Sequence, residues 1–136
     1  NRGTIPFTRI EYRVTDATDL DDARRIWVLN YFFPPYVPFL RPADDQETAR
    51  FGAPPWHADV TCIVRLLDLQ LLEVLFLRTD TPPVWITPRD DGKCRNWEAV
   101  ARLGDHGFIL VTDKYPETLM AYLPLPGAAD PRGESK

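Results

Sequence analysis

The chain has 136 residues, of which 44% are hydrophobic and 26% charged, and its formal net charge is −4 at pH 7. This length and composition are typical of one globular domain with its own core. The negative charge disfavours non-specific binding to nucleic acid, and no charge-free apolar stretch of about 18 residues predicts a membrane span. We therefore expect one domain over residues 1–124, a disordered tail over 125–136, and no membrane association.

The first two predicted elements are a strand and a helix. Polar and apolar residues alternate over residues 8–14, which predicts a half-buried strand. Thr18 and Asp21 then resemble the start of a helix, because a capping residue is followed by a carboxylate three positions later. The apolar residues of this predicted helix follow at helical spacing and end before Pro34: Leu20, Ala23, Trp27 and Tyr31.

An arm rich in proline and aromatic residues follows, over residues 30–42. Its prolines exclude a helix interior or a central strand, so we expect an extended arm. Five aromatic side chains carry roughly 750–1250 Å², more than the largest apolar patch of about 300–600 Å² on a soluble monomer. Either the domain's own core or a partner must cover them. The candidate binding residues are Tyr31, Phe32, Phe33, Tyr36 and Phe39, with Trp56 nearby.

Residues 60–78 are ambiguous between a helix and a hairpin. Their leucines suit a helix, but the polar residues do not gather on one helical face. We therefore predict a hairpin with strands over 60–67 and 71–78 and a turn at 68–70. Further along, the pattern predicts a strand over 84–87, a short helix from Asn96 to Gly104, and a strand over 108–112. Residues 118–123 suit either a last strand or a helix.

Together these elements predict an α+β fold. It would be a mainly antiparallel sheet of about five to six strands, with two helices packed on one face. Cys62 and Cys94 are too few for a disulfide framework. A free, buried Cys62 is the favoured interpretation, and a bridge between the two cysteines stays open.

Catalytic motifs are absent from the sequence, and the single serine, Ser135, lies near its end. Neither a metal nor another cofactor is expected, because no spacing matches a known signature. Two histidines could still act as general base and general acid in phosphodiester cleavage. In this alternative, a small metal-independent nuclease-like hydrolase would use His57 and His106, with Lys114 and Tyr115 stabilising and orienting the phosphate.

The favoured hypothesis is a non-enzymatic protein–protein interaction or regulatory module. Its partner would be another protein or a second copy of the chain, and the arm together with Trp56 would form the contact surface. Because the sequence starts without methionine, we also expect a domain excised or processed from a longer chain. No signal peptide is visible, and the sequence does not indicate a compartment.

Overall fold

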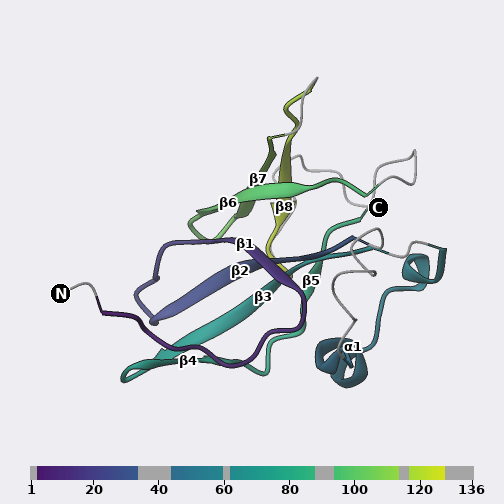
Figure 1. The fold of residues 1–136 in the computed structure, drawn as a ribbon. Helices are drawn as coiled ribbons and strands as arrows, with labels where there is room; N and C mark the ends of the chain where they lie inside the picture. Colours follow the sequence, from purple (N-terminus) through teal and green to yellow (C-terminus); the bar gives the residue numbers. More distant parts are fainter. Residues whose placement is uncertain (1–2, 34–43, 60–61, 88–93, 114–116, 128–136) are drawn as a thin grey trace.

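The computed structural model describes residues 3–33, 44–59, 62–87, 94–113 and 117–127. These residues form two antiparallel sheets that face each other (Figure 1). The larger sheet contains β1 (Arg13–Ala17), β2 (Arg25–Phe32), β3 (Ile63–Leu72), β4 (Leu75–Arg78) and β5 (Val84–Trp85). The smaller contains β6 (Trp97–Leu103), β7 (Gly107–Thr112) and β8 (Met120–Pro124). We call them sheet A and sheet B.

The predicted α+β class is therefore wrong. Among the described residues the one α-helix is α1 (Gln46–Phe51), and η2 (Pro55–Asp59) is a 3-10 turn. Neither predicted helix forms, since residues 25–32 belong to β2 and residues 97–103 to β6. Asp21 does not start a helix, because its carboxylate instead accepts from the backbone N–H of Arg25, 2.8 Å away. No described helix is long and apolar enough to cross a bilayer.

The apolar residues from Trp27 to Tyr31 fit both the repeat of a helix and the repeat of a strand. Trp27 and Tyr31 are four residues apart, as on a helix face, but Trp27, Leu29 and Tyr31 also alternate as on one face of a strand. The residues between them, Val28 and Asn30, are buried as well. One face of β2 packs between the two sheets, and the other packs through Val28 in a second hydrophobic cluster, so both faces are covered. Its pairing with β3 decides for the strand.

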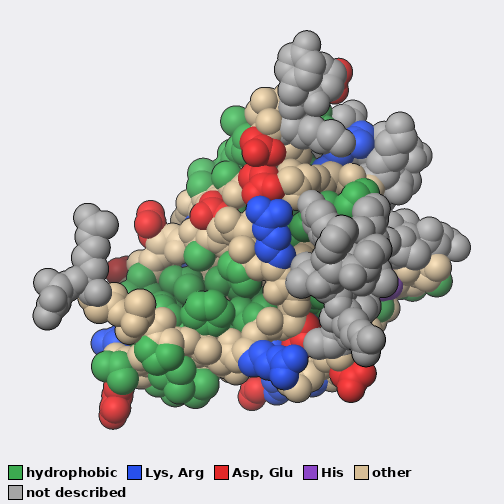
Figure 2. All heavy atoms as spheres, in the orientation of Figure 1, with side chains coloured by type: hydrophobic (Ala, Val, Ile, Leu, Met, Phe, Trp, Pro, Cys, Tyr) green, Lys and Arg blue, Asp and Glu red, His purple; other side chains and the backbone are tan. Residues whose placement is uncertain are grey.

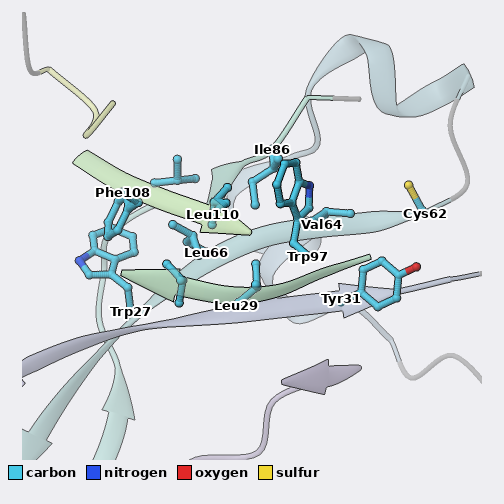
Figure 3. Packing of buried hydrophobic residues seen from close by; sticks show 12 residues of the cluster. Trp27, Leu29, Tyr31, Cys62, Val64, Leu66, Ile86, Trp97, Phe108 and Leu110 are labelled. Carbon is cyan, nitrogen blue, oxygen red and sulfur yellow. The ribbon is translucent and has the colours of Figure 1, made fainter. Parts of the chain in front are cut away.

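Between the two sheets lies the main hydrophobic core (Figure 3). Sheet A contributes Leu29 and Leu66, both fully buried, and sheet B contributes Phe108 and Leu110. The Trp27 ring meets Phe108 edge-on, with 5.2 Å between ring centroids. This shared core holds the two sheets together as one unit.

A disulfide bond closes one end of this core. Cys62 and Cys94 are bonded, with their Cα atoms 6.3 Å apart, inside the normal range for a disulfide. The interpretation of Cys62 as a free thiol is therefore wrong, and the bridge that the sequence left open is formed. Cys62 directly precedes β3 and Cys94 lies just before β6, so the bond links the two sheets.

The hairpin predicted over residues 60–78 exists, but its turn lies elsewhere. β3 continues to Leu72, and the two-residue turn contains Glu73 and Val74 instead of residues 68–70. Asp68, expected in the turn, is buried in β3, where it accepts from Thr79 Oγ1 at 2.7 Å and pairs with Arg25. The turn is placed where Glu73 adopts a positive φ of 48°.

The chain before β1 runs along β4 instead of forming the strand predicted over residues 8–14. The Thr8 N–H donates to the Phe76 carbonyl at 2.8 Å, and the Phe76 N–H donates to the Pro6 carbonyl at 3.0 Å. Glu11, one of the polar residues in the alternation that predicted a half-buried strand, is buried and pairs with Arg78 at 2.6 Å. This segment and β4 thus form the lower edge of sheet A in Figure 1.

Candidate interaction surface

Two of the arm residues proposed as binding residues lie inside the domain. Tyr31 and Phe32 end β2 and keep only 4% and 9% of their surface exposed. Phe33 is half-buried against the main core, and its ring stacks with Tyr31 at 6.5 Å. Tyr36 and Phe39 lie outside the described residues. The described part of the arm is therefore largely covered by the chain itself and leaves little free surface.

Trp56 lies in η2 beside Trp85 of β5. Their rings meet nearly perpendicular, with centroids 6.1 Å apart, and Trp56 is half-buried. His57 contacts the same Trp85 ring at 5.1 Å, and its buried Nε2 atom has no hydrogen-bond partner. This small aromatic group fastens η2 to sheet A.

The two histidines of the nuclease alternative are not brought together. His57 neighbours Trp85, which is opposite Arg65 near the start of β3. His106 is exposed in the β6–β7 turn, beyond Arg102, whose guanidinium pairs with Asp21. Asp21 bonds to Arg25, which pairs with Gln70 near the other end of β3. Five residues of β3 separate these positions, roughly 16 Å of strand. Lys114 and Tyr115 lie outside the described residues, so the structure gives no geometry for their roles.

A groove of about 420 Å³ lies between the β1–β2 connection and the β6–β7 hairpin. Asp21 and Asp105 in its wall both pair with Arg102, at 2.5 and 3.6 Å. Hydrogen bonds from backbone and Arg102 lower the pKa of Asp21, although its partial burial acts in the other direction. No group of side chains suited to a metal ion is found in the described ranges.

Charged residues on the outer face of sheet A hold α1 in place. Arg65 has no exposed surface, and its guanidinium donates to both carboxylate oxygens of Asp45 at 2.9 Å and to Asn30 Oδ1 at 2.9 Å. Arg78 pairs with Glu47 of α1 at 2.8 Å. Burial alone would raise the pKa of Asp45, but the bonds from Arg65 keep it below its ordinary value. We call Arg65 and Asp45 the buried clamp.

Five of the eight exposed large apolar side chains in the described residues lie at the tip of the β3–β4 hairpin and on the segment beside it. Figure 2 shows hydrophobic side chains collected at this end of the molecule, at lower left. Val74 in the turn is 70% exposed, and four neighbours are between 36% and 54% exposed. We call these five residues the hairpin patch: Ile5, Phe7, Leu72, Val74 and Leu77.

The strand register shows on which face of the hairpin each of these side chains lies. Leu72 and Leu77 share one face of the hairpin, because directly opposite and alternate residues point the same way. Phe7 pairs with Phe76, whose side chain points to the opposite face of the hairpin from Leu77. Ile5 lies two residues before Phe7 and follows on that opposite face. The exposed side chains therefore wrap around the tip and the outer edge of sheet A. Sequence reasoning missed the patch. The signal was the run of residues 71–77, in which six of seven residues are apolar, so that neither face of the strand is polar.

Charges of both signs border the hairpin patch. The Arg24 side chain reaches the turn, where it donates to the carbonyl oxygens of Leu71 at 3.3 Å and Glu73 at 3.4 Å. Both Arg24 and Glu73 are exposed. An apolar centre with a polar rim is the usual anatomy of a protein–protein contact.

Comparison with known proteins adds no relative. No protein-family model, no curated protein and no solved structure matches the chain.

Proposed function

We propose that this protein is a protein–protein interaction module that self-associates through the hairpin patch. The observation that carries the proposal is the exposure of five large apolar side chains at one end of the molecule. Isolated exposed apolar residues are normal, but adjacent ones mark interaction sites.

The size of the patch fits the centre of a small dimer interface. Taking about 150–200 Å² for a side chain of this size, the exposed fractions amount to about 400–500 Å² per chain, spread around the hairpin tip and both faces of the sheet edge. A standard interface buries about 800 Å² per partner, so the patch would supply its apolar centre and polar neighbours the rest. We expect a weak dimer with a Kd that is roughly micromolar.

Charge supports a second copy as the partner. In a dimer with two-fold symmetry the same surface meets itself, so each Arg24 can face the other copy's Glu73. The patch therefore complements itself, with apolar residues in the centre and opposite charges at the border. A patch bordered by charges of one sign would instead repel its own copy.

The test is the molar mass by size-exclusion chromatography with light scattering, from about 1 µM to about 1 mM protein. We expect the mass to rise toward that of a dimer. Leu72→Gln combined with Leu77→Gln should keep the protein monomeric. Leu20→Gln is the matched control and should leave the dimer intact, because Leu20 has the same exposure as Leu72, 48%, but lies outside the patch. A wild-type protein that stays monomeric throughout contradicts the proposal.

Charge reversal tests the symmetry of the contact separately. Arg24→Glu and Glu73→Arg should each weaken the dimer, because like charges then face each other. The double variant should recover it, since each new pair is again of opposite charge. Equal loss in all three variants contradicts the two-fold arrangement.

A further inference from the structure

β8 has one edge that no described strand covers. In sheet B the order is β6, β7, β8, so β8 pairs on one side only. Such an edge presents a row of backbone N–H and C=O groups that can accept another strand.

The backbone groups on this edge follow from the hydrogen bonds to β7. The Thr112 N–H donates to the Leu119 carbonyl at 3.0 Å, and the Leu125 N–H donates to the His106 carbonyl at 3.2 Å. Both pairs fit the β7–β8 register, and hydrogen-bonded residues alternate along an antiparallel strand. Ala121 and Leu123 therefore also bond to β7. Met120, Tyr122 and Pro124 direct their backbone groups to the open edge.

The other long edges of the two sheets are blocked. Residues Pro6 and Thr8 bond to the outer edge of β4, as described above. Between β1 and β6, the Thr15 hydroxyl donates to the Trp97 carbonyl at 3.1 Å, and the Val100 N–H donates to Asp16 at 2.8 Å. The edge of β8 has no lysine or inward-pointing charge to discourage pairing. Its first residue, Met120, is 72% exposed.

We propose that β8 binds an extended peptide from another protein as a fourth strand of sheet B. The added strand would lie beside Leu119, Ala121 and Leu123, which are only partly buried against the core. Alternate residues of the peptide would cover them, so a partner with apolar residues at every second position fits best. This site is separate from the hairpin patch and independent of self-association.

The edge itself favours a foreign strand over a second copy of β8. Pro124 has no N–H. The open edge of β8 therefore offers two N–H donors, of Met120 and Tyr122, and three carbonyl acceptors. If two copies of β8 paired about Tyr122, each Met120 carbonyl would face the other copy's Pro124 and lack a donor. A peptide without proline supplies a donor for every carbonyl.

The first experiment uses a probe peptide of ten alternating valine and threonine residues with a lysine at each end. Backbone amide exchange is followed by NMR on the monomeric Leu72→Gln/Leu77→Gln variant, so that failure of the dimer does not affect the result. We expect the Met120 and Tyr122 amides to exchange rapidly alone and to become protected by about 1 mM peptide. The Ala121 and Leu123 amides should be protected throughout, because they already bond to β7.

Backbone methylation of the probe distinguishes strand addition from other binding. N-methylation of all valines or of all threonines removes the donors of one peptide edge. One of these two peptides should bind at least tenfold more weakly, and the other should bind like the unmodified probe. On the protein, Met120→Pro should weaken binding, whereas Met120→Ala should not, because only proline removes the backbone donor.

Three results would overturn the proposal. The first is that the Met120 and Tyr122 amides gain no protection at about 1 mM probe. The second is an equal effect of both methylated peptides. The third is protection that grows with protein concentration alone while the molar mass doubles, since this would identify a second copy as the added strand.

Discussion

At the scale of single residues, close backbone contact makes Gly107 hard to replace. A Cβ atom at this position would lie 2.2 Å from the Leu123 carbonyl oxygen of β8, a backbone atom that cannot move aside. We predict that Gly107→Ala lowers the free energy of unfolding by about 2–3 kcal/mol, because β7 and β8 must separate locally. Urea denaturation measures this loss. Gly3→Ala is the control, since nothing lies within 4 Å of that position, and an equal effect of both variants would contradict the explanation.

Single residues also show where sequence reasoning reaches its limit. The strands predicted over 84–87 and 108–112 correspond to β5 and β7, because β-branched residues and phenylalanine between turns favour strands. The sequence predicts Tyr31 and Phe32 as part of an extended arm and as candidate binding residues, but they end a strand whose partner, β3, lies more than 30 residues away. The sequence alone does not show this pairing, so it could not show that both rings are buried.

At the scale of elements, the buried clamp fixes α1 to sheet A and makes the attachment depend on pH. The pKa of Asp45 is lowered in the folded protein, since Arg65 stabilises its charged form more than burial destabilises it. A lowered folded pKa means that the stabilisation is complete above the unfolded value of about 3.9 and is lost as the pH falls through the folded pKa. The clamp therefore contributes fully at neutral pH.

We predict that acidification from pH 7 to about pH 2 destabilises the wild-type protein more than Asp45→Asn. The variant should be less stable at pH 7, by roughly 3 kcal/mol, because Arg65 is left buried without its countercharge. Thermal unfolding at a series of pH values gives both numbers. Parallel pH profiles of the two proteins would show that Asp45 does not cause the acid sensitivity.

The elements also explain why the hairpin patch was missed. The sequence predicts a turn at residues 68–70, which would leave Leu71 and Leu72 inside a long second strand. Asp68 instead pairs with Arg25 and is bound by two threonine hydroxyls, Thr79 at 2.7 Å and Thr81 at 2.9 Å. Those partners come from two separate parts of the chain, far from each other in sequence. Only their meeting in space moves the turn to Glu73 and exposes the leucines at its tip.

At the scale of the whole molecule, the disulfide joins the two sheets across a sequence separation of 32 residues. Closing a loop of this length restricts the unfolded chain, which should stabilise the fold by about 3–4 kcal/mol. We predict that the double variant Cys62→Ala/Cys94→Ala loses about this amount in urea denaturation. Dithiothreitol should destabilise the wild type and leave the double variant unchanged. A wild-type midpoint that is insensitive to reductant would contradict this prediction.

The fold class, like the single strands, could be predicted from the sequence only in part. Composition correctly indicates a chain able to form a core, and the antiparallel character of the sheet follows from its short strands and turns. The division into two sheets does not follow, because it depends on which strands meet. The spacing of Trp97, Val100 and Ala101 suits a helix, yet in β6 Trp97 and Val100 both reach the core, since the strand is irregular between Trp97 and Ala99.

The two opposite charges within β3 have a consequence for accurate folding. Leucines occupy both faces of this strand. Hydrophobic burial alone would therefore tolerate a shift of β3 by one residue against its neighbouring strands. Arg65 and Asp68 are an odd number of positions apart and therefore point to opposite sides, each toward its own countercharge. A slipped strand would bring Arg65 between the two sheets and Asp68 away from Arg25. These two charges thus select the correct register of β3 against its neighbouring strands. The cost is the desolvation of two ionised side chains.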